Sequence, residues 1–307
     1  MRAICEAPGK IILTGEHFVV HKAYALAAAI GKKVRVEAIP WTGLVVQSAH
    51  SRNVSGLLPV EKTIRKLYAD MGAEPKVRLR ITSEIPNASG LGSSASTMVA
   101  AVGAVNKLEG WNIPLDSVVD HAMVGEREIH GRPSGIDVSV SALGGVILFR
   151  LGEKPKRVTV ARETKVLVIL SGVRRDTGRL ITKVSSLGDE YPGFFAGLCD
   201  AMSSISQLAA TKLKTGNEVE LGRLMTYNHA VLGRVGASTP ELDKIVDICL
   251  SSGCLGAKLT GAGGGGSAIA LPPRGGAEIA LNALRGAGFD GFLTSIPAGG
   301  LRAWVES

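Results

Sequence analysis

The segment IPNASGLGSSAS, residues 85–96, has the composition of an anion-binding loop. Its glycines allow backbone N–H groups to approach an anion closely, and a helix that begins just after them would add its positive N-terminal end, so phosphate is the expected ligand. The hydroxyls of Ser93 and Ser94 are available to cap that helix or to reach a metal ion. The segment lacks the Gly-Lys-Ser/Thr ending of a Walker A loop. A capped helix after a flexible turn is the alternative without a ligand.

The same segment also fits the dinucleotide-binding pattern G-x-G-x-x-A, from Gly90 to Ala95. That fold requires an acidic residue at the end of a second strand, about 20 residues later. Glu109 has the required spacing, but it closes a predicted helix. The sequence therefore disfavours a dinucleotide-binding fold.

A second glycine-rich segment, LTGAGGGGSAIA, covers residues 259–270 and matches G-x-G-x-x-G between Gly261 and Gly266. Five glycines in six positions are costly to order. Their presence indicates a backbone that comes very close to a ligand or to the other glycine loop. A flexible loop is the alternative.

The segment GEREIHGRPSGIDVSVSALGG, residues 125–145, concentrates titratable side chains. These are Glu126, Glu128, His130 and Asp137. A turn at residues 133–135 would place Asp137 at the mouth of the next element, and a buried acid beside a lysine is a plausible base or charge anchor for an alcohol. Solvated or ion-paired acids are the alternative. The histidines show no H-E-x-x-H spacing, so a metal site made of His and Cys is not expected.

The elements around these segments predict a mixed α and β chain. Residues 76–82 alternate apolar and polar side chains, which is typical of a half-buried strand. A helix is expected from Ser94, with Ser93 or Ser94 as its N-cap and Gly110 as its stop. The first glycine-rich segment therefore lies between a strand and a helix.

Further strands and helices are expected on both sides of this unit. KIILTGEHFVV and KKVRVEAI are predicted to be strands joined by a tight turn, and GGVILFR, KVLVILSG and the last residues supply others. Residues 194–213 and 218–235 have helical apolar spacing. The polar stretch LGEKPKRVTVARETK is the predicted domain boundary.

Composition excludes several classes of protein. The 307 residues are 45% hydrophobic and 4% aromatic, and the net charge of +8 comes from lysines and arginines without a run of five. Nucleic-acid binding is disfavoured, and attraction of small anionic substrates explains the sign of the charge. The four cysteines are scattered along the chain, so free thiols are expected. The sequence shows no apolar leader, and the uncharged stretch 85–106 has too few apolar residues to span a membrane. We therefore expect a soluble cytoplasmic protein without a membrane partner.

Three segments in order, APGKIILTGEHFVVH, IPNASGLGSSAS and KLTGAGGGGSAIA, resemble the three motifs of the GHMP small-molecule kinases. With IHGRPSGIDVSVSALGG, the chain is similar to the mevalonate kinases of the shorter archaeal or bacterial type. Galactokinases carry an acid and usually Thr where this chain has Phe18 and Val19. The resemblance implies an α+β, two-domain fold: residues 1–156 as the N-terminal ATP-binding domain and 157–307 as a ferredoxin-like C-terminal domain, with the active site in the cleft between them.

The resemblance also implies a role for individual residues. Asp137 matches the catalytic carboxylate, Lys10 the lysine beside it, and Ser94 and Glu126 the magnesium ligands. The residues matching the nucleotide-binding motifs are Asn87, Ala88, Ser89, Gly90, Leu91, Gly92, Ser93, Ser94 and Ala95, with Gly261 and Gly263 in the supporting third motif. The residues matching the substrate pocket are Glu16, His17, Ser134 and Thr177.

The implied reaction is the transfer of phosphate from ATP, with Mg²⁺, to the C5 hydroxyl of mevalonate in isoprenoid biosynthesis. Another kinase of the superfamily, acting on phosphomevalonate, a different mevalonate hydroxyl, homoserine or a sugar, is the first alternative, and a non-catalytic nucleotide-binding sensor is the second. The oligomeric state is left open, with a homodimer considered. The chain departs from the family pattern at Ala88 and Ser89 in the phosphate loop. It also departs at Lys22, a position where the family commonly has a glycine, and there we expect a different local turn.

Overall fold

The computed structural model describes residues 1–307 except 50–56, 87, 174–183, 185 and 307. The first of its two sheets is mixed and seven-stranded, with the order β11-β1-β2-β4-β3 and with β5 and β6 attached beside β2. Its strands are β1 (Arg2–Thr14), β2 (Ala25–Pro40), β3 (Leu44–Ser48), β4 (Val77–Ser83), β5 (Val146–Phe149), β6 (Lys156–Val158) and β11 (Arg302–Glu306). The pair β3–β4 is parallel and the other pairs are antiparallel.

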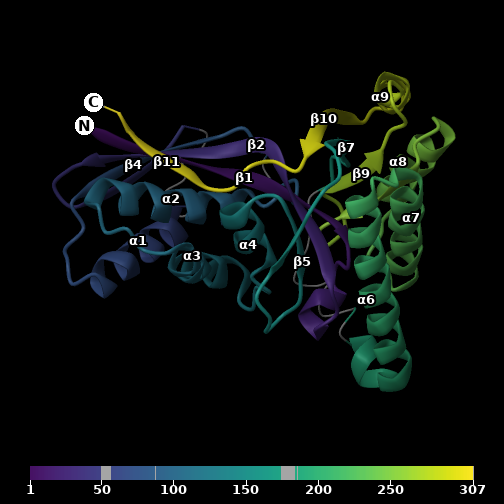
Figure 1. Cartoon of the computed structure of the whole chain (residues 1–307), viewed down its shortest axis with the longest axis horizontal. Helices are drawn as coiled ribbons and strands as arrows, with labels where there is room; N and C mark the ends of the chain where they lie inside the picture. The colour runs from purple at the N-terminus through teal and green to yellow at the C-terminus, as the bar shows by residue number, and fades with distance from the viewer. Residues whose placement is uncertain (50–56, 87, 174–183, 185, 307) are drawn as a thin grey trace.

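Four helices lie along one face of this sheet (Figure 1). They are α1 (Leu58–Asp70), α2 (Ser93–Glu109), α3 (Leu115–His130) and α4 (Ile136–Leu143). Most residues of helix α2 between Ala95 and Val105 are buried. The helix packs on β1 and β2, and α3 and α4 cover its other sides. The predicted helix after Ser94 and the predicted strand at residues 76–82 are both confirmed.

The second sheet is antiparallel, with the order β10-β7-β9-β8. Its strands are β7 (Thr164–Leu170), β8 (Gly256–Thr260), β9 (Ser267–Leu271) and β10 (Asp290–Ile296), and its helices are α6 (Pro192–Thr215), α7 (Glu218–Arg234), α8 (Pro240–Ser251) and α9 (Ala277–Gly286). Helices α6 to α8 connect the first two strands and α9 connects the last two, which is the strand and helix sequence of a ferredoxin-like unit. The α+β fold with two domains is confirmed.

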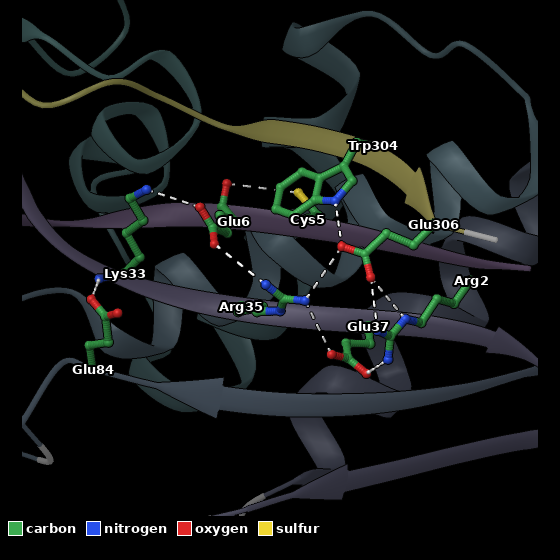
Figure 2. Close-up of polar contacts among 9 residues, drawn as sticks. All are labelled: Arg2, Cys5, Glu6, Lys33, Arg35, Glu37, Glu84, Trp304 and Glu306. Atoms are coloured by element: carbon green, nitrogen blue, oxygen red, sulfur yellow. Dashed lines mark hydrogen bonds and ion pairs between the residues drawn. The ribbon is translucent and has the colours of Figure 1, made fainter.

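Strand β11 returns to the first sheet and pairs with β1, with Arg2 opposite Glu306. Figure 2 shows the charged side chains that cross these strands: Arg2 contacts Glu306 at 2.8 Å and Glu37 at 3.2 Å, and Arg35 lies within 4.0 Å of Glu6. Residues 302–306 therefore complete the first sheet. Strand β6 begins at the predicted boundary, residue 156, and pairs with β5 of the first sheet. Because residues on both sides of position 156 therefore belong to the first sheet, the division at this residue stays a proposal.

Two local predictions are wrong. The first strand ends at Thr14 and not within GEHFVV, because Gly15 has φ 95° and turns so tightly that a Cβ there would lie 2.5 Å from the carbonyl of Tyr24. A short 3₁₀ helix, Phe18–His21, follows. Helix α2 is capped by Gly92 and not by a serine hydroxyl, because the backbone enters the helix through a left-handed residue.

Lys22 has φ 64°, in the left-handed region that favours glycine, so a lysine holds here the backbone conformation a glycine would adopt. None of the helices in the described part of the chain combines the length and apolar content needed to cross a bilayer.

Candidate active site

Strand β1 carries Lys10 directly beneath the first glycine-rich loop. The backbone N–H of Lys10 donates to the carbonyl of Leu91 at 2.8 Å. The preceding Gly9 allows this approach, since a Cβ there would lie 2.9 Å from the same carbonyl oxygen. The Lys10 side chain is 3% exposed, so its charge is held in a nearly dry place.

The loop itself turns through left-handed residues before α2 begins. Gly90 and Gly92 have φ of 85° and 78°, and a Cβ on Gly92 would lie 2.8 Å from Cγ of Lys10. Ala88 also has a positive φ, and Ser89 donates its hydroxyl hydrogen to the carbonyl of Pro86 at 2.7 Å. Asn87 lies outside the described residues. The chain thus places a helix N-terminus, from Ser93 onward, beside a buried lysine, an arrangement that favours an anion.

Asp137 is the second residue of α4 and forms an ion pair with Lys10, with 3.1 Å between Nζ and Oδ1. Gly135 precedes the helix with φ 88°, and Ser134 Oγ accepts from the N–H of Ile136 at 3.4 Å. The chain bends at Gly135 directly before the helix, and this places Asp137 at the start of an element, as predicted. The Asp137 side chain is 32% exposed, so the carboxylate is accessible while its lysine partner is not.

Glu126 on α3 is the third charged group of this site. Its side chain is buried, and among the described residues its Oε1 has no hydrogen-bond partner. Burial, and then the negative charge of Asp137, raise the pKa of Glu126 to about 7, while a hydrogen bond from Ser94 and the charge of Lys10 act in the opposite direction. A buried carboxylate oxygen without a donor is what a cation would satisfy.

The donor set fits Mg²⁺ better than a transition metal. Ser94 and Glu126 offer a hydroxyl and a carboxylate, and Mg²⁺ is usually bound through one or two protein carboxylates together with substrate phosphates and water. Within the described ranges no three His, Cys, Asp or Glu side chains gather as a metal-binding group. Ser94 and Glu126 could therefore hold a metal ion only together with ligands from another molecule, such as phosphate oxygens or water.

The second glycine-rich segment lies in the hairpin between β8 and β9. A Cβ on Gly263 would lie 2.1 Å from the carbonyl oxygen of Ala237, and one on Gly265 would lie 2.6 Å from that of Val173. These glycines are required by the close approach of the chain to its own backbone. Just after them, Ser267 donates to the carbonyl of Ser89 at 2.8 Å, which joins this segment to the first glycine loop.

Glu16 and His17 also connect the two glycine-rich parts of the molecule. The fully buried Glu16 carboxylate contacts Nζ of Lys258 through Oε1 and accepts from Asn228 Nδ2 through Oε2 at 3.1 Å. His17 Nε2 lies 2.5 Å from the carbonyl oxygen of Ala262. Both side chains hold the loop after β1 against the second sheet, and contact with a substrate stays a prediction for them.

Lys258 and Asn228 were not among the residues expected from the sequence. One signal could have identified them: a single lysine stands in the short apolar segment GAKLT, whose residues are all buried in the structure. A lysine buried in such a strand requires an acidic partner. Of the other expected substrate residues, Ser134 lies in the turn before Asp137 and Thr177 falls outside the described residues.

Comparison with known proteins identifies the family of the chain. The model of the GHMP kinases N terminal domain matches residues 59–145, and that of the GHMP kinases C terminal matches residues 209–290. Mevalonate kinases of Aeropyrum pernix and Pyrococcus furiosus are 33% and 34% identical to the chain, each over 98% of both proteins. The solved mevalonate kinase of L. major, in complex with R-mevalonate, superposes with a TM-score of 0.84 at 29% identity over 96% of both chains. That of Methanococcus jannaschii superposes with the same score at 27% identity, over 95% of this chain and 98% of that one. The chain belongs to the GHMP kinases and, within them, to the mevalonate kinase family.

Proposed function

We propose that the chain transfers the γ-phosphoryl group of ATP to the C5 hydroxyl of (R)-mevalonate, giving ADP and 5-phosphomevalonate. The observation that carries this proposal is the 3.1 Å ion pair between Lys10 and Asp137, set beside the glycine loop and the buried Glu126. The acceptor is inferred from the names of the relatives. The expected place in the cytoplasm and the homodimer stay predictions.

In this proposal, Asp137 binds the acceptor hydroxyl and accepts its hydrogen as the oxygen attacks phosphorus. Lys10 keeps the carboxylate oriented, and its ammonium charge stabilises the developing alkoxide and the transferred phosphoryl group. Because the Lys10 side chain is only 3% exposed, water screens that charge weakly. In phosphoryl transfer most of the rate comes from such positioning and electrostatic stabilisation.

The N–H groups of residues 88–95, together with Asn87, would hold the nucleotide phosphates at the start of α2. Ser94 and Glu126 would hold Mg²⁺, which when bound neutralises phosphate charge during transfer. These residues all lie within 1–156, which we propose as the ATP-binding domain, and Gly261 and Gly263 from 157–307 brace the loop. Glu16, His17, Ser134 and Thr177 are proposed to shape the acceptor pocket.

The test is a coupled assay of ADP release with ATP and Mg²⁺, offered mevalonate, 5-phosphomevalonate, homoserine and galactose in parallel. The position of the new phosphate is then determined by phosphorus NMR, and Mg²⁺ is omitted as a control. Turnover on mevalonate with phosphate on the C5 oxygen supports the proposal. Turnover on another acceptor alone, or nucleotide binding without turnover, contradicts it.

A further inference from the structure

Two fully buried hydroxyls, those of Ser96 and Ser141, lie 3.1 Å apart between α2 and α4. Ser96 stands two residues after Ser94 on α2, and Ser141 stands one helical turn after Asp137 on α4. The pair therefore joins the helix that begins at the glycine loop to the helix that carries the carboxylate.

Ser96 has two further contacts, both with backbone carbonyls. Its Oγ lies 2.7 Å from the carbonyl oxygen of Pro8 and 2.8 Å from that of Gly92. Pro8 precedes Lys10 by two residues on β1, and Gly92 is the residue that caps α2. One hydroxyl thus contacts the strand of Lys10, the glycine loop and the helix of Asp137.

Counting hydrogens favours one direction for these bonds. A serine hydroxyl has one hydrogen to donate, and carbonyl oxygens only accept. Two carbonyl oxygens, those of Pro8 and Gly92, lie closer to Ser96 Oγ than Ser141 Oγ does, so they compete for the Ser96 hydrogen. We therefore assign the hydrogen between the two serines to Ser141.

We infer that Ser96 and Ser141 are positioning residues, which set the separation of Asp137 from Lys10 and from the glycine loop. Helix α4 has eight residues and packs through apolar side chains such as Val138 and Val140, and at its C-terminal end the N–H of Leu301 donates to the carbonyl of Ala142 at 3.0 Å. The bond between Ser141 and Ser96 adds a directional side-chain contact that ties this helix to α2. In a reaction that depends on alignment, a displacement of about 1 Å costs about 100-fold in rate. The inference rests on the proposed function and names no contact with substrate.

Ser141→Ala removes the donor to Ser96 and leaves the Ser96 bonds to the backbone in place. We expect kcat to fall about tenfold, while the dissociation constant for ATP changes by less than twofold. Ser96→Ala removes the contacts with β1 and the loop as well, so kcat should fall and ATP binding should weaken in the same variant.

Ser139→Ala is the matched control, because Ser139 is a buried serine on the same helix whose hydroxyl donates to the carbonyl of Gly135, the N-cap of that helix, at 2.8 Å and, among the described residues, makes no bond to α2. Its kcat should stay within twofold of wild type. Unfolding midpoints are measured for all variants, so that a general loss of folded protein is separated from an effect on kcat. The positioning role is overturned when Ser141→Ala keeps the wild-type kcat, or when Ser139→Ala and Ser141→Ala lose activity equally.

The acceptor used is whichever one the wild type phosphorylates in the panel described above. Activity on an acceptor other than mevalonate would contradict the proposed function and leave the serine comparison intact. A wild type inactive on the whole panel would overturn both.

Discussion

Ser267 donates its hydroxyl hydrogen to the carbonyl oxygen of Ser89 at 2.8 Å, although 178 residues separate them in the sequence. Ser267 begins β9 in the second sheet, and Ser89 lies in the glycine loop that leads into α2. The bond is buried. The second domain therefore holds the loop proposed to bind nucleotide, and the following predictions test this and the other contacts of the site.

Replacing Ser267 by Ala should raise KM for ATP about three- to tenfold and leave kcat within about twofold, because one buried hydrogen bond contributes about 1 kcal/mol. Steady-state kinetics with varied ATP measure both constants. Ser295→Ala, on β10 and bonded to Lys165 at the surface, is the control and should match wild type. An unchanged KM for ATP in Ser267→Ala would show that the bond does not hold the loop in its binding conformation.

Asp137→Asn should lower kcat at least about 100-fold, the scale of lost acid–base catalysis, since an amide does not accept the acceptor's proton. The affinity for ATP should change by less than about threefold, because Asp137 faces the acceptor in the proposed mechanism. Turnover is measured by ADP release and affinity by nucleotide titration. Near-normal turnover would remove Asp137 from the reaction.

Gly92→Ala should reduce turnover more than tenfold. The added Cβ would lie 2.8 Å from Cγ of Lys10, and the residue has φ 78°, so the Lys10 side chain or the loop must shift and the ion pair with Asp137 is disturbed. Gly110→Ala is the control, since Gly110 ends the same helix with φ 69° and a Cβ there meets nothing within 4 Å. The control should lose about 1 kcal/mol of stability, the usual penalty of a left-handed conformation, and keep its turnover. Equal turnover in the two variants would exclude a specific effect on Lys10.

Glu126 predicts a pH-dependent stability for the protein without metal or nucleotide. The folded-state pKa of about 7 lies above the ordinary value of 4.5, so between these pH values the folded protein keeps a proton that the unfolded chain has released. The favourable contribution is complete below pH 4.5 and is lost as the pH rises through about 7. Glu126→Gln has no such group, so relative to wild type its free energy of unfolding should increase by roughly 3 kcal/mol between about pH 5 and pH 8. Urea denaturation at the two pH values measures this change, and parallel curves for the two proteins would refute the prediction.

Glu16→Gln and Lys258→Met should each lower the free energy of unfolding by about 3–5 kcal/mol, because each leaves a buried charge without its partner. The double variant should recover a large part of that loss, since neither charge then remains. Chemical denaturation of the four proteins forms a double-mutant cycle. Strictly additive losses would mean that the two side chains are not coupled.

Local patterns predicted the parts of the site that short segments determine. The alternation at residues 76–82 predicted a strand, the start and stop signals between Ser94 and Gly110 predicted a helix, and the residues before Asp137 predicted that it lies at the start of an element. Each of these features is decided by neighbours a few residues apart.

Long-range contacts could not be predicted in this way. Glu16 and Lys258 are 242 residues apart, and nothing near either residue identifies the other. The glycine cap of α2 was missed because serines such as Ser93 and Ser94 are common N-caps. The close approach of Gly92 to Lys10, which leaves no room for a side chain there, appears only in the folded chain. The pairing of β11 with β1 likewise depends on the assembled sheet.

The pairing of β1 with β11 has a consequence for synthesis of the chain. Arg2 lies opposite Glu306, 304 positions away in the sequence, so the ribosome must translate the whole second domain before β1 acquires this neighbour. At about 5–20 residues per second, that takes roughly 15 to 60 s. Throughout that time one edge of β1 carries unpaired N–H and C=O groups along residues 2–6, the kind of edge on which chains associate. The first domain to emerge is thus the last to be completed.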